Sequence, residues 1–219
     1  MMQNRDTAHF NMLEQQVRPA YVLDLRVLAA IENVKREHFV DDEFAGLAYA
    51  DTALPIGFGQ SILPPIIDGR LLQALNVQED EEVLEIGTGS GYFTALLAQL
   101  AHSVTTVEIV PELSERARQN LERAGVGNVN FCVGDASQQW TLTNRAAVIV
   151  ATAALEAVSD EYKQSLAVGG RMLAVVGKEN HMTVQLIRRV TEREWQTESL
   201  FETVIPAMMN AEPKAEFEF

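Results

Sequence analysis

Apolar residues recur at helical spacing near the start of the chain. Between residues 11 and 38 they follow a helical pattern that is interrupted at Arg18-Pro19, and a proline inside a helix removes a backbone hydrogen bond. The pattern therefore predicts two helices separated by that proline. Residues 41–65 are rich in glycine and proline and predict a loop without regular structure. Helical periodicity returns at 66–75.

From Val83 onward, short apolar runs alternate with helical stretches. This alternation is typical of a parallel sheet with helices on both faces. Two β-rich runs near the end, 183–189 and 195–204, predict a closing antiparallel pair, and a short helix is expected before Gly169-Gly170. Predicted strands begin at 83 and span 103–107, 130–133, 147–150 and 171–176, and predicted helices span 92–100 and 111–124.

Length and composition predict one domain with an elaboration. The chain has 219 residues, of which 47% are hydrophobic, enough for a substantial core. It has 17 basic and 31 acidic residues and a formal net charge of -14, which opposes nonspecific binding to nucleic acid or to an anionic membrane. We therefore expect neither partner, and the oligomeric state stays open.

Cysteine and histidine usage narrows the setting further. The only cysteine, Cys132, excludes an intramolecular disulfide and favours a reduced, cytoplasmic environment. Four scattered histidines lack metal-ligand spacing, so we predict no metal. No run is long enough to cross a bilayer, and the N-terminus lacks the apolar core of a signal peptide.

The segment 83–92 carries the most specific motif. An apolar run containing Glu85 leads into glycines at 87, 89 and 91, and such a turn before a helix lets backbone N–H groups approach a ligand. A dinucleotide-binding GxGxxG pattern needs a small residue where Tyr92 stands. The pattern E-x-G-x-G-x-G instead resembles the first motif of class I methyltransferases, which bind S-adenosylmethionine. A glycine-rich loop of another α/β protein is the alternative.

Two further acids follow the next predicted strands. Glu108, 17 residues after Gly91, is placed to accept hydrogen bonds from both hydroxyls of a ribose. Asp135 is placed to accept from an adenine amino group. Each alone could be ordinary, Glu108 as a solvated strand-end acid and Asp135 as a turn residue. Three acids in order at three strand ends favour the cofactor interpretation.

Motifs along nearly the whole chain, up to about Pro206, resemble the protein-L-isoaspartate O-methyltransferase family. They lie at 27–28, 34–40, 48–51, 54–57, 59–60, 83–92, 111–113, 134–135, 169–171 and 176–177. The resemblance implies a Rossmann-like class I methyltransferase fold with an N-terminal helical extension and a mostly parallel sheet ending in an antiparallel strand. It also implies methyl transfer from S-adenosylmethionine to the abnormal carboxylate of isoaspartyl residues in damaged proteins.

The resemblance also implies a division of the chain and a set of site residues. Residues 1–76 would form part of the substrate side, 77–209 the cofactor-binding core, and 210–219 an acidic tail. Ser61 is the candidate catalytic residue, because its hydroxyl could orient the substrate carboxylate. The expected cofactor-binding residues are Gln60, Ser61, Glu85, Gly87, Thr88, Gly89, Ser90, Gly91, Glu108, Ile109, Asp135 and Ala136.

The chain departs from the family pattern on the substrate side. Leu63 stands where the family usually has a serine whose hydroxyl helps to bind the substrate carboxylate, and Phe58 stands where histidine is frequent. Residues 151–154 differ from the usual Thr-Ala-Ala-Pro. Three hypotheses therefore stay open: isoaspartyl repair, methylation of another carboxylate or small molecule, and a non-catalytic module that binds S-adenosylmethionine.

Overall fold

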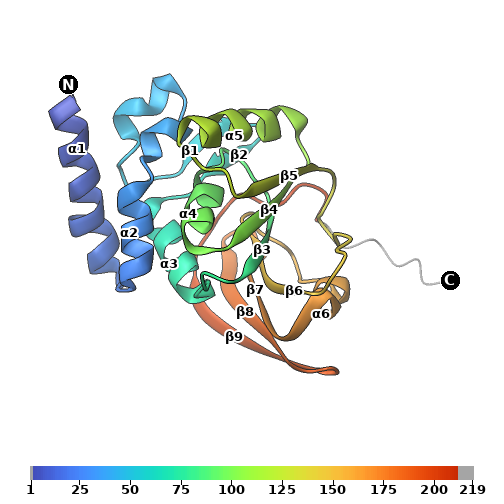
Figure 1. Ribbon diagram of the computed structural model, residues 1–219. Coiled ribbons are helices and arrows are strands. Elements are labelled where there is room, and N and C mark those ends of the chain that lie inside the picture. The colour runs from blue at the N-terminus through green and yellow to red at the C-terminus, as the bar shows by residue number, and fades with distance from the viewer. Residues whose placement is uncertain (1, 212–219) are drawn as a thin grey trace.

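A seven-stranded sheet runs through the protein in a computed structural model, which describes the backbone of residues 2–211 and the side chains of residues 5–211 (Figure 1). Its strand order is β5-β4-β3-β6-β7-β8-β9. The strands are β3 (Glu82–Ile86), β4 (Ser103–Glu108), β5 (Val129–Val133), β6 (Ala146–Ala151), β7 (Leu166–Lys178), β8 (His181–Thr191) and β9 (Glu194–Glu202). The first five pair in parallel, and β8 and β9 add antiparallel strands. The predicted α/β fold is confirmed.

Side chains alternate between the two faces of the sheet, as strand geometry requires. In β6, Val148 and Val150 join the larger core, whereas Ile149 and Ala151 join the smaller one. The larger core lies against α1 to α5, and α6 packs against the smaller core (Figure 1). The helices are α1 (Met2–Asn11), α2 (Leu25–Asn33), α3 (Pro65–Leu75), α4 (Tyr92–Leu100), α5 (Pro111–Arg123) and α6 (Asp160–Ser165).

The N-terminal extension contains the predicted break at Pro19. Helix α1 continues through a π-helical segment, η1 (Met12–Val17), and ends in a 3₁₀ turn, η2 (Arg18–Ala20). Tyr21 then adopts a left-handed conformation with φ +67° before α2 begins. Further 3₁₀ turns are η3 (Arg36–Phe39) and η4 (Asp42–Leu47).

The prediction that residues 41–65 lack regular structure is wrong. This segment contains a β-hairpin of β1 (Leu54–Gly57) and β2 (Gln60–Ile62) in addition to η4. Phe58 and Gly59 connect the strands with φ values of +55° and +72°, as a tight hairpin turn requires. Glycine here makes the turn of a hairpin, and Pro55 is accommodated in a short strand outside the main sheet.

The expected boundary at Gly169-Gly170 is also corrected. Strand β7 begins earlier, at Leu166, and continues through both glycines with a bulge in its pairing to β6. Gly169 has φ +84°, and a Cβ on Gly170 would lie 2.8 Å from the Ala146 carbonyl oxygen. The glycines thus permit a bulge where a break between helix and strand was expected.

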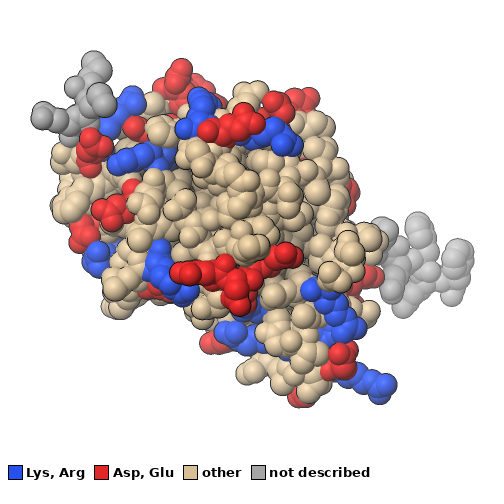
Figure 2. Space-filling model, in the orientation of Figure 1, with Lys and Arg blue, Asp and Glu red and all other residues tan. Residues whose placement is uncertain are grey.

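Charged side chains are distributed around the surface (Figure 2). On the face shown, basic side chains lie mostly beside acidic ones, around a broad central region without charged groups. Within the described part of the chain, no helix has both the length and the apolar character needed to cross a membrane. Most of the predicted acidic tail, residues 212–219, lies outside the described residues.

Candidate functional site

An open cavity lies at the carboxyl ends of the central strands. Strands β4 and β5 extend the sheet to one side of β3, and the chain then returns to place β6 on the other side. Ligands bind at such a switch in strand order in open α/β sheets. The space between its walls, counted together with the open solvent at its mouth, is about 780 Å³.

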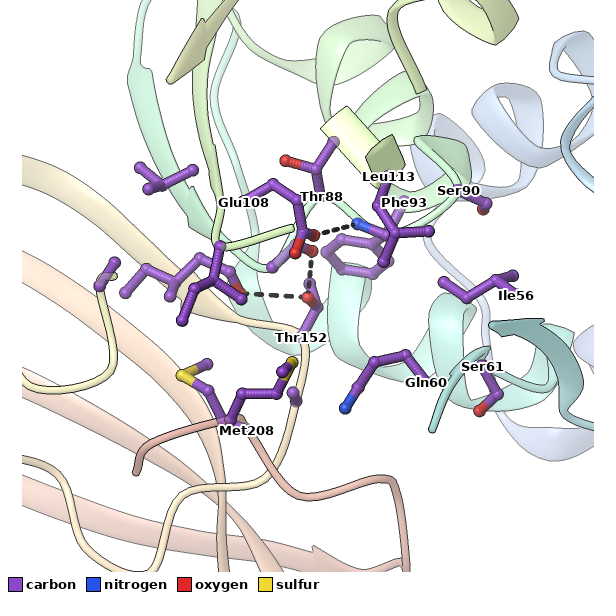
Figure 3. Close-up of a pocket in the computed structure, with 18 of the residues that line it drawn as sticks. Ile56, Gln60, Ser61, Thr88, Ser90, Phe93, Glu108, Leu113, Thr152 and Met208 are labelled. Atoms are coloured by element: carbon purple, nitrogen blue, oxygen red, sulfur yellow. Dashed lines mark hydrogen bonds between the residues drawn. The ribbon is translucent and has the colours of Figure 1, made fainter. Parts of the chain in front are cut away.

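The cavity wall combines segments that are far apart in the sequence (Figure 3). The lining residues are Ile56, Gln60, Ser61, Ile62, Leu63, Asp68, Ile86, Gly87, Thr88, Gly89, Ser90, Phe93, Val107, Glu108, Ile109, Leu113, Gly134, Asp135, Ala136, Ser137, Thr152, Ala153, Met208 and Met209. All the predicted site residues lie in this wall except Glu85 and Gly91.

The glycine turn after β3 forms the floor of the cavity. Gly87 has φ +98°, and a Cβ at this position would lie 2.6 Å from Thr152 Oγ1. The Thr152 hydroxyl donates hydrogen bonds to the carbonyl oxygens of Gly87 and Ile86 (Figure 3). Gly89 also adopts a left-handed conformation, with φ +55°. Because Gly87 and Gly89 have no side chains, the backbone of the turn is exposed to the cavity. Side chains at these positions would occupy that space.

Glu108 holds this turn in place. Its Oε2 accepts a hydrogen bond from the Gly89 N–H at 2.9 Å (Figure 3). Its Oε1 accepts one from the Val110 N–H at 3.1 Å. The side chain is only 6% exposed, so the alternative of a solvated strand-end acid is wrong. Each carboxylate oxygen has a second lone pair, so Glu108 can still accept hydrogen bonds from a ligand.

Glu85, predicted as a cofactor-binding residue, lies beneath the cavity and is not among its lining residues. The side chain is fully buried, and its Oε2 accepts hydrogen bonds from the hydroxyls of Thr94 at 2.5 Å and Thr106 at 2.6 Å. Thr106 Oγ1 in turn lies 2.6 Å from Thr88 Oγ1 in the glycine turn. Burial raises the pKa of Glu85 to about 8. Glu85 thus supports the turn from below through two threonines.

Gly91 also has a structural position. A Cβ here would lie 2.5 Å from Leu121 Cδ1 and 3.2 Å from the Ala117 Cβ. Gly91 therefore permits α4 to pack closely against α5. The third glycine of the motif is required for helix packing, and like Glu85 it is not among the residues that line the cavity.

Asp135 lies at the cavity edge beside the C-terminal segment. Its Oδ1 accepts a hydrogen bond from the Ser137 N–H at 2.9 Å, the turn geometry considered from the sequence. Its Oδ2 accepts one from Asn210 Nδ2 at 3.0 Å. Asp135 therefore both shapes the turn after β5 and faces the cavity.

The β1–β2 hairpin forms the opposite wall. Gln60 and Ser61 lie across the cavity from Glu108 and Thr88 (Figure 3). Gln60 Nε2 donates a hydrogen bond to the Ala207 carbonyl oxygen at 3.2 Å, which joins the hairpin to the C-terminal segment.

Sequence reasoning missed several lining residues. Phe93 and Leu113 lie on the cavity-facing first turns of α4 and α5, and their positions next to the recognised motifs could have indicated them. Met208 and Met209 had no such signal, because they lie beyond the last strand. Asp68, a buried acid on α3, was equally unexpected. Among the described residues, no group of three histidine, cysteine or acidic side chains could hold a metal ion.

Known proteins resemble this chain in both sequence and fold. The family model for protein-L-isoaspartate(D-aspartate) O-methyltransferase (PCMT) matches residues 7–211. The chain belongs to this family. A curated family relative from Picosynechococcus is 40% identical over 84% of this chain and 83% of its own length. One from Methanoculleus marisnigri is 42% identical over 81% of each chain.

A solved structure extends the family comparison to the fold. A Plasmodium falciparum protein assigned as a protein-L-isoaspartate O-methyltransferase, in complex with S-adenosyl-L-homocysteine, superposes with a TM-score of 0.79. The match covers 91% of this chain and 97% of that chain at 18% identity. At this identity the likeness concerns the fold. The family predicted from the sequence motifs is confirmed.

Proposed function

We propose that this protein transfers a methyl group from S-adenosylmethionine to the free carboxylate of isoaspartyl residues in proteins or peptides. The observation that carries the proposal is about 40% identity to curated protein-L-isoaspartate O-methyltransferases over most of the chain. The position of the cavity at the strand-order switch adds physical support.

The cavity residues fit S-adenosylmethionine. The left-handed turn at Gly87 and Gly89 leaves backbone exposed for the amino acid part of the cofactor. Glu108 retains lone pairs for the ribose hydroxyls, and Asp135 lies at the cavity edge, where we place the adenine. Ile109 and Ala136 would supply apolar contacts beside these acids.

The proposed chemistry requires little from acidic or basic side chains. A substrate carboxylate with a pKa near ~4 is already ionised at neutral pH and can attack without a general base. S-adenosylmethionine supplies an electrophilic methyl group on a positively charged sulfur. The protein must align the carboxylate with that methyl, and alignment can contribute roughly 7 to 11 kcal/mol. Ser61 and Gln60 in the hairpin wall are our candidates for this orientation.

A second acceptor class is favoured by one observation. Leu63, which cannot donate a hydrogen bond through its side chain, lines the cavity and is 5% exposed. A missing hydrogen bond to a charged group costs roughly 1.5 to 3 kcal/mol. Another carboxylate or a small-molecule acceptor that makes no such contact is therefore the alternative substrate.

We further propose a cytoplasmic setting and a protein or peptide partner. The proposal is supported by the single cysteine and by the family relationship. The net charge of -14 favours neither nucleic acid nor an anionic membrane as partner. We also keep the division into a substrate-side extension, 1–76, and a cofactor-binding core, 77–209, as a proposal.

The test is a comparison of two peptides that differ only in one linkage. The purified protein is incubated with S-adenosylmethionine and a peptide containing either isoaspartate or normal aspartate at the same position. We expect S-adenosylhomocysteine to form only with the isoaspartyl peptide. Equal formation with both peptides, or none with either beside clear cofactor binding, would reject isoaspartyl methylation.

A further inference from the structure

Asp68 is a buried acid in the wall of the cavity. It lies in the first turn of α3 and is 1% exposed, and it lines the cavity together with Leu63. Leu63 has no hydroxyl, so it cannot give a substrate carboxylate the hydrogen bond that the family resemblance implies at this position. Asp68 lies in the same cavity wall as Leu63 and could supply a hydrogen-bond donor there.

Arg36 joins Asp68 to the backbone of Leu63. The guanidinium is fully buried, and its Nη1 donates to Asp68 Oδ2 at 3.0 Å while its Nη2 donates to the Leu63 carbonyl oxygen at 2.5 Å. The same group lies 4.9 Å from the centre of the Tyr92 ring. One buried cation therefore binds both the Asp68 carboxyl and the backbone of Leu63 in the wall of the cavity.

Charge balance distinguishes the two protonation states of Asp68. An ionised Asp68 neutralises Arg36, so an incoming substrate carboxylate would add an uncompensated negative charge in a desolvated wall, which is costly. A protonated Asp68 gains an O–H donor and leaves Arg36 available as the positive charge that balances the substrate. The neutral form therefore suits an anionic substrate.

We propose that Asp68, in its protonated form, donates to the substrate carboxylate the hydrogen bond that a serine at position 63 would supply, with Arg36 as the balancing cation. This proposal rests on the proposed isoaspartyl methyltransferase function. The proton stays on Asp68 during the reaction. A carboxylate oxygen forms a bond to the methyl carbon as the methyl–sulfur bond breaks, and the sulfonium charge and the carboxylate charge disappear together.

The surroundings of Asp68 raise its pKa, so that a large fraction of the carboxyl is neutral near neutral pH. Burial raises the pKa of Asp68 to about 7, and the neighbouring Arg36 opposes this rise. The titratable or charged groups that act on it come from three elements and one loop: Arg36 from η3, Glu85 from β3, Tyr92 from α4, and Asp51 from the loop before β1. The negative charge of Asp51 further disfavours a negative charge on Asp68.

The first test is the pH dependence of kcat/KM for an isoaspartyl peptide, followed through S-adenosylhomocysteine so that ester lability at high pH does not matter. We expect kcat/KM of the unaltered protein to fall about tenfold for each pH unit above the pKa of Asp68. Asp68→Asn keeps a donor but does not titrate, so the fall should disappear. A rate that rises through this range, or a fall that persists in Asp68→Asn, would overturn the proposal.

The second test is a double-mutant cycle with Leu63→Ser. We expect Asp68→Leu to lower kcat/KM at least tenfold, Leu63→Ser to restore most of it in that background, and Leu63→Ser alone to change it less than threefold. Equal effects of Leu63→Ser in both backgrounds would overturn the proposal. Unchanged cofactor affinity in each variant verifies folding, and Asp68→Asn still provides the test if Asp68→Leu does not fold.

Failure of the proposed function has a different signature. If the unaltered protein and Asp68→Asn both bind S-adenosylmethionine but form no product with the isoaspartyl peptide at any pH, isoaspartyl methylation is rejected and the role of Asp68 falls with it. If the unaltered protein is active and only the pH profile or the cycle disagrees, the methyltransferase proposal stands and the role of Asp68 alone is rejected.

Discussion

The two walls of the cavity differ in how tightly their residues are held. On the cofactor side, Glu108 and Thr152 each bind the backbone of the glycine turn, and Glu85 supports it through buried hydroxyls. On the substrate side, a short hairpin carries Phe58 at its tip, 55% exposed and in a left-handed conformation. Among the departures from the family pattern, Phe58 lies where few contacts constrain it, whereas Leu63 and most of residues 151–154 are buried. The hairpin tip can therefore change while the cofactor wall keeps its geometry.

The largest expected effect is on the cofactor side. Glu108→Ala removes the acceptor of two backbone N–H groups and the candidate ribose ligand. Hydrogen bonds to charged groups contribute about 1.5 to 3 kcal/mol each, so we expect at least a hundredfold loss of S-adenosylmethionine affinity by calorimetry. Glu112→Ala, an exposed acid in α5, is the control and should bind normally. A similar affinity for both variants would contradict the role of Glu108.

The buried support of the turn predicts a pH-dependent stability. The pKa of Glu85 is raised to about 8 from an ordinary 4.5, so the folded state binds a proton more tightly than the unfolded state. The contribution of Glu85 to the free energy of unfolding is fully present below pH 4.5. It is lost as pH rises through 8, by up to about 1.4 kcal/mol per pH unit.

Glu85→Gln should remove that slope. We expect the free energy of unfolding of the unaltered protein, minus that of Glu85→Gln, to fall by about 2 to 3 kcal/mol between pH 5 and 7, measured by urea denaturation. A constant difference across this range would show that Glu85 does not titrate there, and that its neighbours hold it as a carboxylate.

A pair of glycine substitutions compares the two walls directly. Gly87→Ala combines a left-handed backbone with a Cβ placed 2.6 Å from Thr152 Oγ1, whereas Gly59→Ala in the hairpin has no atom within 4 Å of its Cβ. Both changes strain the backbone, and the clash adds about 1 to 3 kcal/mol at Gly87 alone. Thermal unfolding should show this difference. Equal destabilisation by the two substitutions would mean that the cofactor wall accommodates an added Cβ as readily as the hairpin does.

The smallest expected effect is a gain in stability at the hairpin tip. Phe58 has φ +55°, and asparagine adopts this conformation at lower cost. Phe58→Asn should therefore stabilise the protein by about 1 kcal/mol in thermal unfolding, with cofactor affinity unchanged. A loss of stability would reveal packing of Phe58 that outweighs the backbone strain.

The cofactor side could be predicted largely from the sequence, because strand ends and a glycine turn are local patterns in a fixed order. The roles of Glu85 and Gly91 could not, since they depend on which side chains of α4, α5 and β4 surround them. Glycine and proline occur both in irregular loops and in tight hairpins, so the β1–β2 hairpin could not be distinguished from a loop in the sequence. A role for Asp68 could not be predicted either, because it depends on the contact with Arg36, which is 32 residues away in the sequence.

The central claim is that the cavity at the end of β3, β4 and β6 binds S-adenosylmethionine. Calorimetric titration of the purified protein with S-adenosylmethionine tests it most directly, with Glu108→Ala titrated in parallel. We predict saturable binding at one site per chain, weakened in Glu108→Ala. No detectable binding at millimolar S-adenosylmethionine by a folded protein would contradict the account.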